Sequence, residues 1–236
     1  MFPGAALSDH AGRQNSFRDR IKSLLARIDC RPATSNKRRA EIFHLRYEAG
    51  MRERALSQHS SLTFSDRYDN AGNVHLFGLY IDNELASSIR LHIASKYRHQ
   101  FPSLDAFADV LQSELEAGQV VVDCTRFVAD ERLAQIYREL PYATLRLCML
   151  AAEHFKADYL ITAASPTHQA FYRRAFNFRP ISGPRLHPDV AIPVRLMTLN
   201  YPAAVDDLYG RYPFFRSTSA ERRKLFGHAG SSVGAA

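Results

Sequence analysis

The sequence contains few cysteines and no long apolar run, and both absences narrow the class of protein. Cys30, Cys124 and Cys148 show no CxxC or Cys/His ligand spacing, so neither a disulfide framework nor a zinc site is expected. The histidines show no mutual ligand spacing either, and no metal is expected. No run approaches the roughly 18 apolar residues of a membrane helix, and the opening MFPGAALSDH lacks the basic-then-apolar order of a signal peptide. We therefore expect a cytoplasmic protein with no transmembrane segment, while peripheral membrane contact stays open.

The composition indicates one folded core with a basic surface. The 236 residues are 46% hydrophobic, and a chain of this length buries about 70% of its unfolded surface. The net charge of +7 indicates an anionic partner, which could be a nucleic acid, a membrane surface or an acidic protein. The sequence shows no zinc-finger spacing, aromatic RNA-binding signature or helix-turn-helix, so a nucleic acid is not the expected partner.

Three segments are predicted along the chain. Residues 1–36 form an N-terminal arm with an amphipathic helix over 16–28, residues 37–226 form the main domain, and residues 227–236 form a disordered tail.

Within the domain, helical and strand-like patterns alternate. The helical patterns cover 37–56, 104–115, 142–156 and 167–176. The strand-like patterns cover 74–81, 85–92, 119–128, 158–163 and 194–199. The first two strands are joined by Asp82-Asn83-Glu84 and predict a hairpin. The later alternation predicts an α/β fold with a mixed, partly parallel sheet flanked by helices.

A motif near residue 172 strengthens this prediction. The segment HQAFYRRAFNF, residues 168–178, resembles the Ala-x-x-x-Tyr-x-x-x-Gly-Phe helix end of the GCN5-related N-acetyltransferase superfamily. Asn177 stands where the superfamily has glycine, and asparagine also enters the left-handed conformation at a helix end. The resemblance implies an N-acetyltransferase-like sheet whose strands splay at the acyl-thioester site. It also implies that Tyr172 protonates the departing thiolate; a packed core tyrosine is the alternative.

A narrower resemblance links the chain to the acyl-homoserine-lactone synthases and the related N-acyl amino acid synthases. It consists of an Arg-Tyr pair, an Asp-x-x-Asp pair, an arginine closing the hairpin and an acid-x-x-Arg-Phe strand. The matching residues are Arg46-Tyr47, Asp66, Asp69, Arg90, and Asp123 with Arg126-Phe127. The resemblance implies that an arginine grips the carboxylate of a small amino-acid acceptor while Asp66 and Asp69 order its amine. The alternatives are that these aspartates cap a turn or form a salt-bridge set with Arg46 and Arg90.

Differences from the acyl-homoserine-lactone synthases indicate which of the two families the chain resembles more. Gly50 stands where those enzymes have an aromatic that closes over S-adenosylmethionine, and the chain has no tryptophan. Asp123 replaces the usual glutamate. These differences favour an N-acyl amino acid synthase. A lactone synthase is the second candidate, and a non-catalytic protein that binds an acyl carrier or nucleic acid is the third.

A missing glycine loop indicates the acyl donor. Relatives of this fold that use acetyl-coenzyme A carry Gln/Arg-x-x-Gly-x-Gly/Ala after the fourth strand, where backbone N–H groups hold the pyrophosphate. This chain has no glycine between Asp130 and Leu145. We therefore expect no bound cofactor. The expected donor is the acyl-phosphopantetheine of an acyl carrier protein, whose acidic surface suits a basic partner.

The chemistry of acyl transfer suggests further roles on the fourth strand. An attacking amine must lose a proton, for which Asp123 is the candidate base; a purely structural aspartate is the alternative. The backbone N–H groups of Phe127 or Val128 could stabilise the oxyanion by roughly 3 kcal/mol. Strand alternation separates Asp123 from Arg126, so either a β-bulge near Thr125 brings them together or Arg126 serves a different wall of the site.

Overall fold

The computed structural model describes residues 16–56, 61–187 and 190–227. The first part of the predicted arm and residues 228–236 of the predicted tail lie outside the described residues. The α-helices are α1 (Phe17–Arg27), α2 (Asn36–Arg52), α3 (Pro102–Glu116), α4 (Glu131–Ile136), α5 (Leu140–Phe155), α6 (Pro166–Phe176), α7 (Tyr201–Arg211) and α8 (Ser219–Phe226). The 3-10 helices are η1 (Arg67–Asn70) and η2 (Pro213–Phe215). The strands are β1 (Ile28–Pro32), β2 (Val74–Ile81), β3 (Glu84–Ala94), β4 (Val121–Ala129), β5 (Tyr159–Ala164), β6 (Arg179–Pro180), β7 (Arg185–His187) and β8 (Val190–Asn200).

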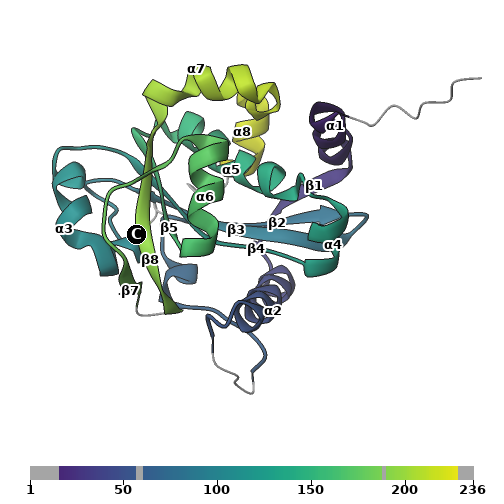
Figure 1. Ribbon diagram of the computed structural model, residues 1–236, viewed down its shortest axis with the longest axis horizontal. Helices are drawn as coiled ribbons and strands as arrows, with labels where there is room; N and C mark the ends of the chain where they lie inside the picture. Colours follow the sequence, from purple (N-terminus) through teal and green to yellow (C-terminus); the bar gives the residue numbers. More distant parts are fainter. Residues whose placement is uncertain (1–15, 57–60, 188–189, 228–236) are drawn as a thin grey trace, which may run out of the picture.

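The strands form one mixed sheet in the order β1-β2-β3-β4-β5-β8-β6, with β7 paired to β8. Within the described residues β4 and β5 are parallel and the other pairs are antiparallel. Figure 1 shows α2 below the strands β2 to β4, with α7 and α8 above the sheet and α6 in front of β5. The predicted mixed α/β sheet flanked by helices is confirmed.

Local sequence explains the hairpin at the centre of the sheet. Asp82 and Asn83 both adopt positive φ angles, of 50° and 67°. Two left-handed residues in a two-residue loop give the turn whose twist matches that of the flanking strands, and Asp and Asn enter this conformation more readily than most residues. The turn therefore fixes the register of β2 against β3, from Ile81 opposite Glu84 onward.

The core lies between the sheet and α5. This helix is apolar on most faces, and ten of its sixteen residues are buried, mainly against β3 and β4. The helix ends where Lys156 takes a left-handed conformation, at φ 54°. At the end of α6 Asn177 does the same, at φ 59°, which confirms the prediction that it replaces a helix-ending glycine.

Both ends of the described chain pack against this core. In the predicted arm, α1 buries Ile21 and Leu24, and β1 pairs with β2 at the edge of the sheet. Towards the C-terminus, where the sequence predicted no elements, α7 and α8 bury Leu208 and Phe226. These segments therefore contribute to the same folded unit as the central strands.

The strands β4 and β5 separate part of the way along their length. They pair only where Val121–Asp123 faces Tyr159–Ile161. On its other edge β4 carries a bulge, because Val128 pairs with Ser88 and Thr125 with Arg90, which leaves two β4 residues opposite one in β3. Arg126 lies in this bulge with a φ of 51°. A bulge near Thr125 is thus present, as one of the two predicted arrangements requires.

Candidate active site

A cavity opens where β4 and β5 separate. Its lining includes residues 124–128 of β4 and residues 162–164 of β5. The helix α2 contributes Arg46 and Gly50, its C-cap contributes Glu53, and α6 contributes His168 and Tyr172. Splayed strands are the one place in such a sheet where a ligand can pass between neighbouring strands, because their backbone groups no longer pair there.

Asp66 and Asp69 are positioned by the short helix η1. Asp66 accepts a hydrogen bond from the backbone N–H of Tyr68 at 2.9 Å, and Asp69 accepts one from the backbone N–H of Asp66 at 3.0 Å. This reciprocal capping holds both carboxylates in fixed orientations. Their remaining oxygens accept hydrogen bonds from arginines, so the turn-capping role and the salt-bridge role occur together.

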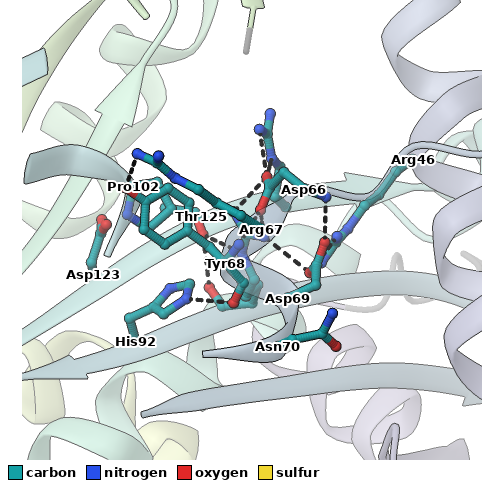
Figure 2. Close-up of polar contacts among 12 residues, drawn as sticks. Arg46, Asp66, Arg67, Tyr68, Asp69, Asn70, His92, Pro102, Asp123 and Thr125 are labelled. Carbon is teal, nitrogen blue, oxygen red and sulfur yellow. Dashed lines mark hydrogen bonds and ion pairs between the residues drawn. The ribbon is translucent and has the colours of Figure 1, made fainter. Parts of the chain in front are cut away.

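Three arginines from three elements meet these two carboxylates. Figure 2 labels Asp66, Asp69 and one of the arginines, Arg46. Arg90 binds Asp66 in a bidentate manner, with Nη1 2.6 Å from Oδ1 and Nη2 3.0 Å from Oδ2, and its Nη1 lies 3.0 Å from Asp69 Oδ1. Arg126 Nη2 lies 2.8 Å from Asp66 Oδ2. Arg46 Nη1 lies 2.8 Å from Asp69 Oδ1. We call these five side chains the charged cluster.

The charged cluster stays ionised although it is buried. Burial would raise the pKa of Asp66, but the Arg90 and Arg126 guanidiniums outweigh it and hold that pKa well below its usual range. The pKa of Asp69 is also lowered, because the positive charges of Arg46 and Arg90 outweigh the effect of burial. Below the cluster, His92 donates from Nε2 to the backbone oxygen of Tyr68 at 3.0 Å. Burial lowers the pKa of His92 to about 3, so this ring is neutral.

Asp123 lies apart from the charged cluster, on the opposite side of Figure 2 from Arg46. It is fully buried and is not among the described residues that line the cavity. Its carboxylate accepts hydrogen bonds from the Ser103 backbone N–H at 3.1 Å and from Ser103 Oγ at 2.9 Å. Burial raises the pKa of Asp123 to about 6 despite these two bonds. Ser103 does line the cavity, so Asp123 is connected to it through one hydroxyl group.

Tyr172 faces the cavity from α6 with its hydroxyl beside Thr162. The residue is 6% exposed. Burial raises the pKa of Tyr172 above its usual value, and the neighbouring thiols of Cys148 and Cys124 add to the shift. The phenol is therefore protonated at neutral pH and can act only as a proton donor there.

The residues predicted from the sequence fall into two groups. The cavity lining includes Arg46, Arg90, Arg126, Phe127, Val128 and Tyr172, whereas Asp66, Asp69 and Asp123 contact it through other residues. The sequence analysis missed Ser103, Glu53 and Thr162. A signal for Ser103 exists, because a buried strand aspartate needs donors and a Pro-Ser pair at a helix start offers them.

The described residues lack two further kinds of feature. They contain no group of three or more His, Cys, Asp or Glu side chains that could hold a metal ion. None of the described helices is long and apolar enough to cross a membrane.

The chain resembles known proteins in both sequence and structure. Residues 41–200 match the family described as N-acyl amino acid synthase FeeM. The structure is similar to that of FeeM, an N-acyl amino acid synthase from uncultured soil microbes, with a TM-score of 0.62 and 18% identity over 75% of this chain and 92% of that one. It is also similar to the acyl-homoserine-lactone synthase LasI (TM-score 0.58, 11% identity, 76% and 95% covered). An acyl-CoA N-acyltransferase from Pseudomonas aeruginosa gives a TM-score of 0.50 at 22% identity, with 72% and 97% covered. No curated protein sequence matched.

At these identities the similar structures establish an N-acetyltransferase-like fold. The family match goes further, because residues 41–200 are more than half of the 236-residue chain. The matched range contains the separated strands β4 and β5, the charged cluster, Asp123 and Tyr172. The chain therefore belongs to the FeeM family of N-acyl amino acid synthases.

Proposed function

We propose that this protein moves a fatty acyl group from the phosphopantetheine thioester of an acyl carrier protein to the amine of a free amino acid, giving an N-acyl amino acid. The observation that carries the proposal is the family match over the residues that build the cavity. The two chemically different sides of the cavity support it, since an ionic acceptor suits the charged cluster and a neutral thioester suits the apolar surroundings of Tyr172.

The start of α5 supports a carrier protein over coenzyme A. A helix N-terminus attracts a pyrophosphate when its backbone N–H groups and positive potential are available. Here Glu139 precedes α5, is 5% exposed, and accepts a hydrogen bond from Arg20 Nε of α1 at 2.5 Å. A buried carboxylate and a covering helix at this position disfavour a second anion, whereas a carrier protein needs no pyrophosphate site.

The surroundings of Gly50 favour a free amino acid over S-adenosylmethionine. A Cβ atom at position 50 would lie 2.4 Å from Cδ1 of Leu56. The space in which the lactone synthases place a cofactor-closing aromatic is therefore occupied here by Leu56 packed against Gly50.

In the proposed reaction, the acceptor ammonium group first gives one proton to Ser103 Oγ as the Ser103 hydroxyl proton passes to Asp123. Asp123 releases this proton to solvent by the same route before the next turnover. The amine nitrogen then attacks the thioester carbon, and the N–H groups of Phe127 or Val128 stabilise the oxyanion. The C–S bond breaks, Tyr172 gives its proton to the sulfur, and the proton that nitrogen loses as the amide forms returns to Tyr172 through solvent. Asp66 and Asp69 order the amine side through the arginines that they hold.

The donor and acceptor can be tested together with purified protein and mass spectrometry of the product. We expect faster transfer from acyl carrier protein than from acyl-coenzyme A. Added salt should raise KM for the carrier. It shortens the Debye length from about 8 Å at physiological salt and so weakens the attraction between the basic protein and the acidic carrier. Equal rates with both donors and no salt effect would remove the carrier from the proposal, and product formed only with S-adenosylmethionine would favour a lactone synthase.

A further inference from the structure

The serine at the start of α6 does not cap its helix. Ser165 is the N-cap residue of α6, a position where a serine hydroxyl ordinarily accepts a hydrogen bond from a backbone N–H of the first turn. Within the described chain its side chain accepts no such bond. The cap residues of three other helices each accept one from the residue three positions further on, namely Ser16, Ser35 and Thr218. The hydroxyl of Ser165 is therefore directed elsewhere.

The Ser165 hydroxyl faces a histidine three residues along the helix. Ser165 Oγ lies 2.9 Å from His168 Nδ1 and 3.0 Å from Thr167 Oγ1. On the far side of the ring, His168 Nε2 lies 3.9 Å from Oε1 of Glu53 at the end of α2. A carboxylate on that side favours a proton on Nε2, which leaves the lone pair of Nδ1 to accept the hydroxyl proton of Ser165.

These side chains meet at the cavity between β4 and β5. Ser165, His168 and Glu53 all belong to its lining. Ser165 directly follows the last residue of β5 and is 8% exposed, whereas His168 and Glu53 are about half exposed. Tyr172 lines the same cavity one turn beyond His168. A hydroxyl nucleophile, a base and an acid that orients the base are thus together beside the proposed position of the thioester. None of the three takes part in the acyl transfer proposed above.

We infer that Ser165 and His168 act as nucleophile and base in a second activity, the hydrolysis of the bound acyl thioester when no acceptor amine is present. Glu53 is the positioning residue that orients the ring of His168. A hydroxyl group that is hydrogen-bonded to an imidazole is activated for attack on an acyl group, and such pairs occur on unrelated folds. This second activity rests on the proposed function only for the presence of a thioester in the cavity.

The hydrolysis proceeds in two stages. Ser165 Oγ attacks the thioester carbon as its proton passes to His168 Nδ1, and the C–S bond breaks as His168 gives that proton to the sulfur. A free thiol leaves, and the acyl group remains as an ester on Ser165. Water then attacks the ester carbon as one of its protons passes to His168, and the bond to Oγ breaks as this proton returns to Ser165. The products are a fatty acid and a thiol, and the protein is regenerated.

The first experiment measures thiol release from a small donor, S-octanoyl-N-acetylcysteamine, with no amino acid present. This donor carries neither a carrier protein nor coenzyme A. The wild-type protein should release thiol continuously, and Ser165→Ala should lose about 100-fold or more of this rate. His168→Gln should lose a similar factor, because an amide does not take up the proton. Glu53→Gln should lose only about tenfold, because its contact with the ring is long.

Ser35→Ala is the matched control, because Ser35 is exposed and caps α2. It should lower the melting temperature and leave thiol release unchanged. Ser165→Ala should do the reverse, because its hydroxyl accepts no capping bond among the described residues. A Ser165→Ala protein with a lower melting temperature and undiminished thiol release would overturn the inference.

A fluorophosphonate reagent gives a readout that a merely structural serine would not give. It should label Ser165 of the wild-type protein, as located by peptide mass spectrometry, and should not label His168→Gln. Labelling and thiol release without N-acyl transfer to any amino acid would support the inference and overturn the proposed function. N-acyl transfer by a protein that is not labelled and releases no thiol would overturn the inference alone. If Ser165→Ala does not fold, the residue labelled in the wild-type protein decides.

Discussion

The two sides of the cavity bury polar groups in opposite ways. On one side the charged cluster keeps its arginines and aspartates ionised, because each charge lies against another of opposite sign. On the other side Tyr172 lies beside Thr162 with the buried thiols of Cys124 and Cys148 behind it. There, burial raises the pKa of both Tyr172 and Cys124, so these groups stay neutral; we call them the neutral side. The comparison teaches that one cavity can present charge to one substrate and exclude it near the other.

The largest expected effect comes from removing the centre of the charged cluster. Arg90→Leu should lower the free energy of unfolding by about 3–5 kcal/mol, because it leaves Asp66 and Asp69 buried without their shared partner. Urea denaturation measures this loss. Arg132→Leu is the control, since its pair with Glu84 is exposed and should contribute less than about 1 kcal/mol. Equal losses in both variants would mean that the cluster is no more than a surface ion-pair set.

Asp123 tests whether a carboxyl group between the two sides takes part in proton transfer. Asp123→Asn keeps the shape and should lower kcat by about 10²-fold with folding retained. Ser103→Ala should lower kcat in the same direction, because the hydroxyl that links Asp123 to the cavity is lost while the backbone hydrogen bond remains. The measurement is kcat and melting temperature on the same preparations. A lower melting temperature with unchanged turnover would assign Asp123 to capping the start of α3 only.

The pH dependence of stability should have opposite signs at Asp123 and Asp66. The folded pKa of Asp123 is about 6, above the unfolded value of about 3.9, so its stabilising contribution is complete below about pH 4 and is lost as the pH rises through 6. The folded pKa of Asp66 is lowered, so its contribution is complete above about pH 4 and is lost as the pH falls further. Relative to Asp123→Asn, the wild-type protein should therefore lose about 2 kcal/mol between pH 4 and pH 7. Denaturation of both proteins at four pH values measures this difference, and a constant difference would contradict it.

The smallest expected effect lies on the neutral side. Tyr172→Phe removes one proton donor, and a thiolate whose conjugate acid has a pKa near 8.5 leaves tolerably without one. We expect roughly a tenfold loss in kcat, greatest for the slowest acyl donors. Single-turnover rates with two acyl chain lengths would measure it. Unchanged rates with both chains would make Tyr172 a packing residue.

The sequence predicted the elements whose patterns are local. The hairpin, the buried helix α5 and the parallel strand pair all follow from periodicity, turn residues and strand–helix alternation. It missed β1 as a strand, because five residues ending in Pro32 carry little strand signal and are fixed by pairing with β2, far along the chain. It also missed α7 and α8, whose apolar residues are few and are buried only by tertiary contacts.

Part of the candidate active site was also predicted from the sequence. The resemblance to a family predicted the residues of the charged cluster. Strand alternation predicted a bulge near Thr125 as one of two ways to place Arg126 in the site. Two features could not be predicted. The contact between Asp123 and Ser103 joins a strand to the start of a helix, and the direction of the Ser165 hydroxyl is defined only by what surrounds it in three dimensions.

The N-terminal segment has a consequence for how the protein behaves in solution. The family match begins at residue 41, but the sheet begins at β1, which covers the outer edge of β2. A chain that begins at residue 33 lacks α1 and nearly all of β1. It would expose the backbone N–H and C=O groups of residues 77–81 and the core residues that Ile21 and Leu24 cover. An open, apolar edge strand pairs readily with another copy of itself. We therefore expect the segment before the matched region to protect the protein against self-association, and a chain that lacks it should aggregate even though its cavity residues are all present.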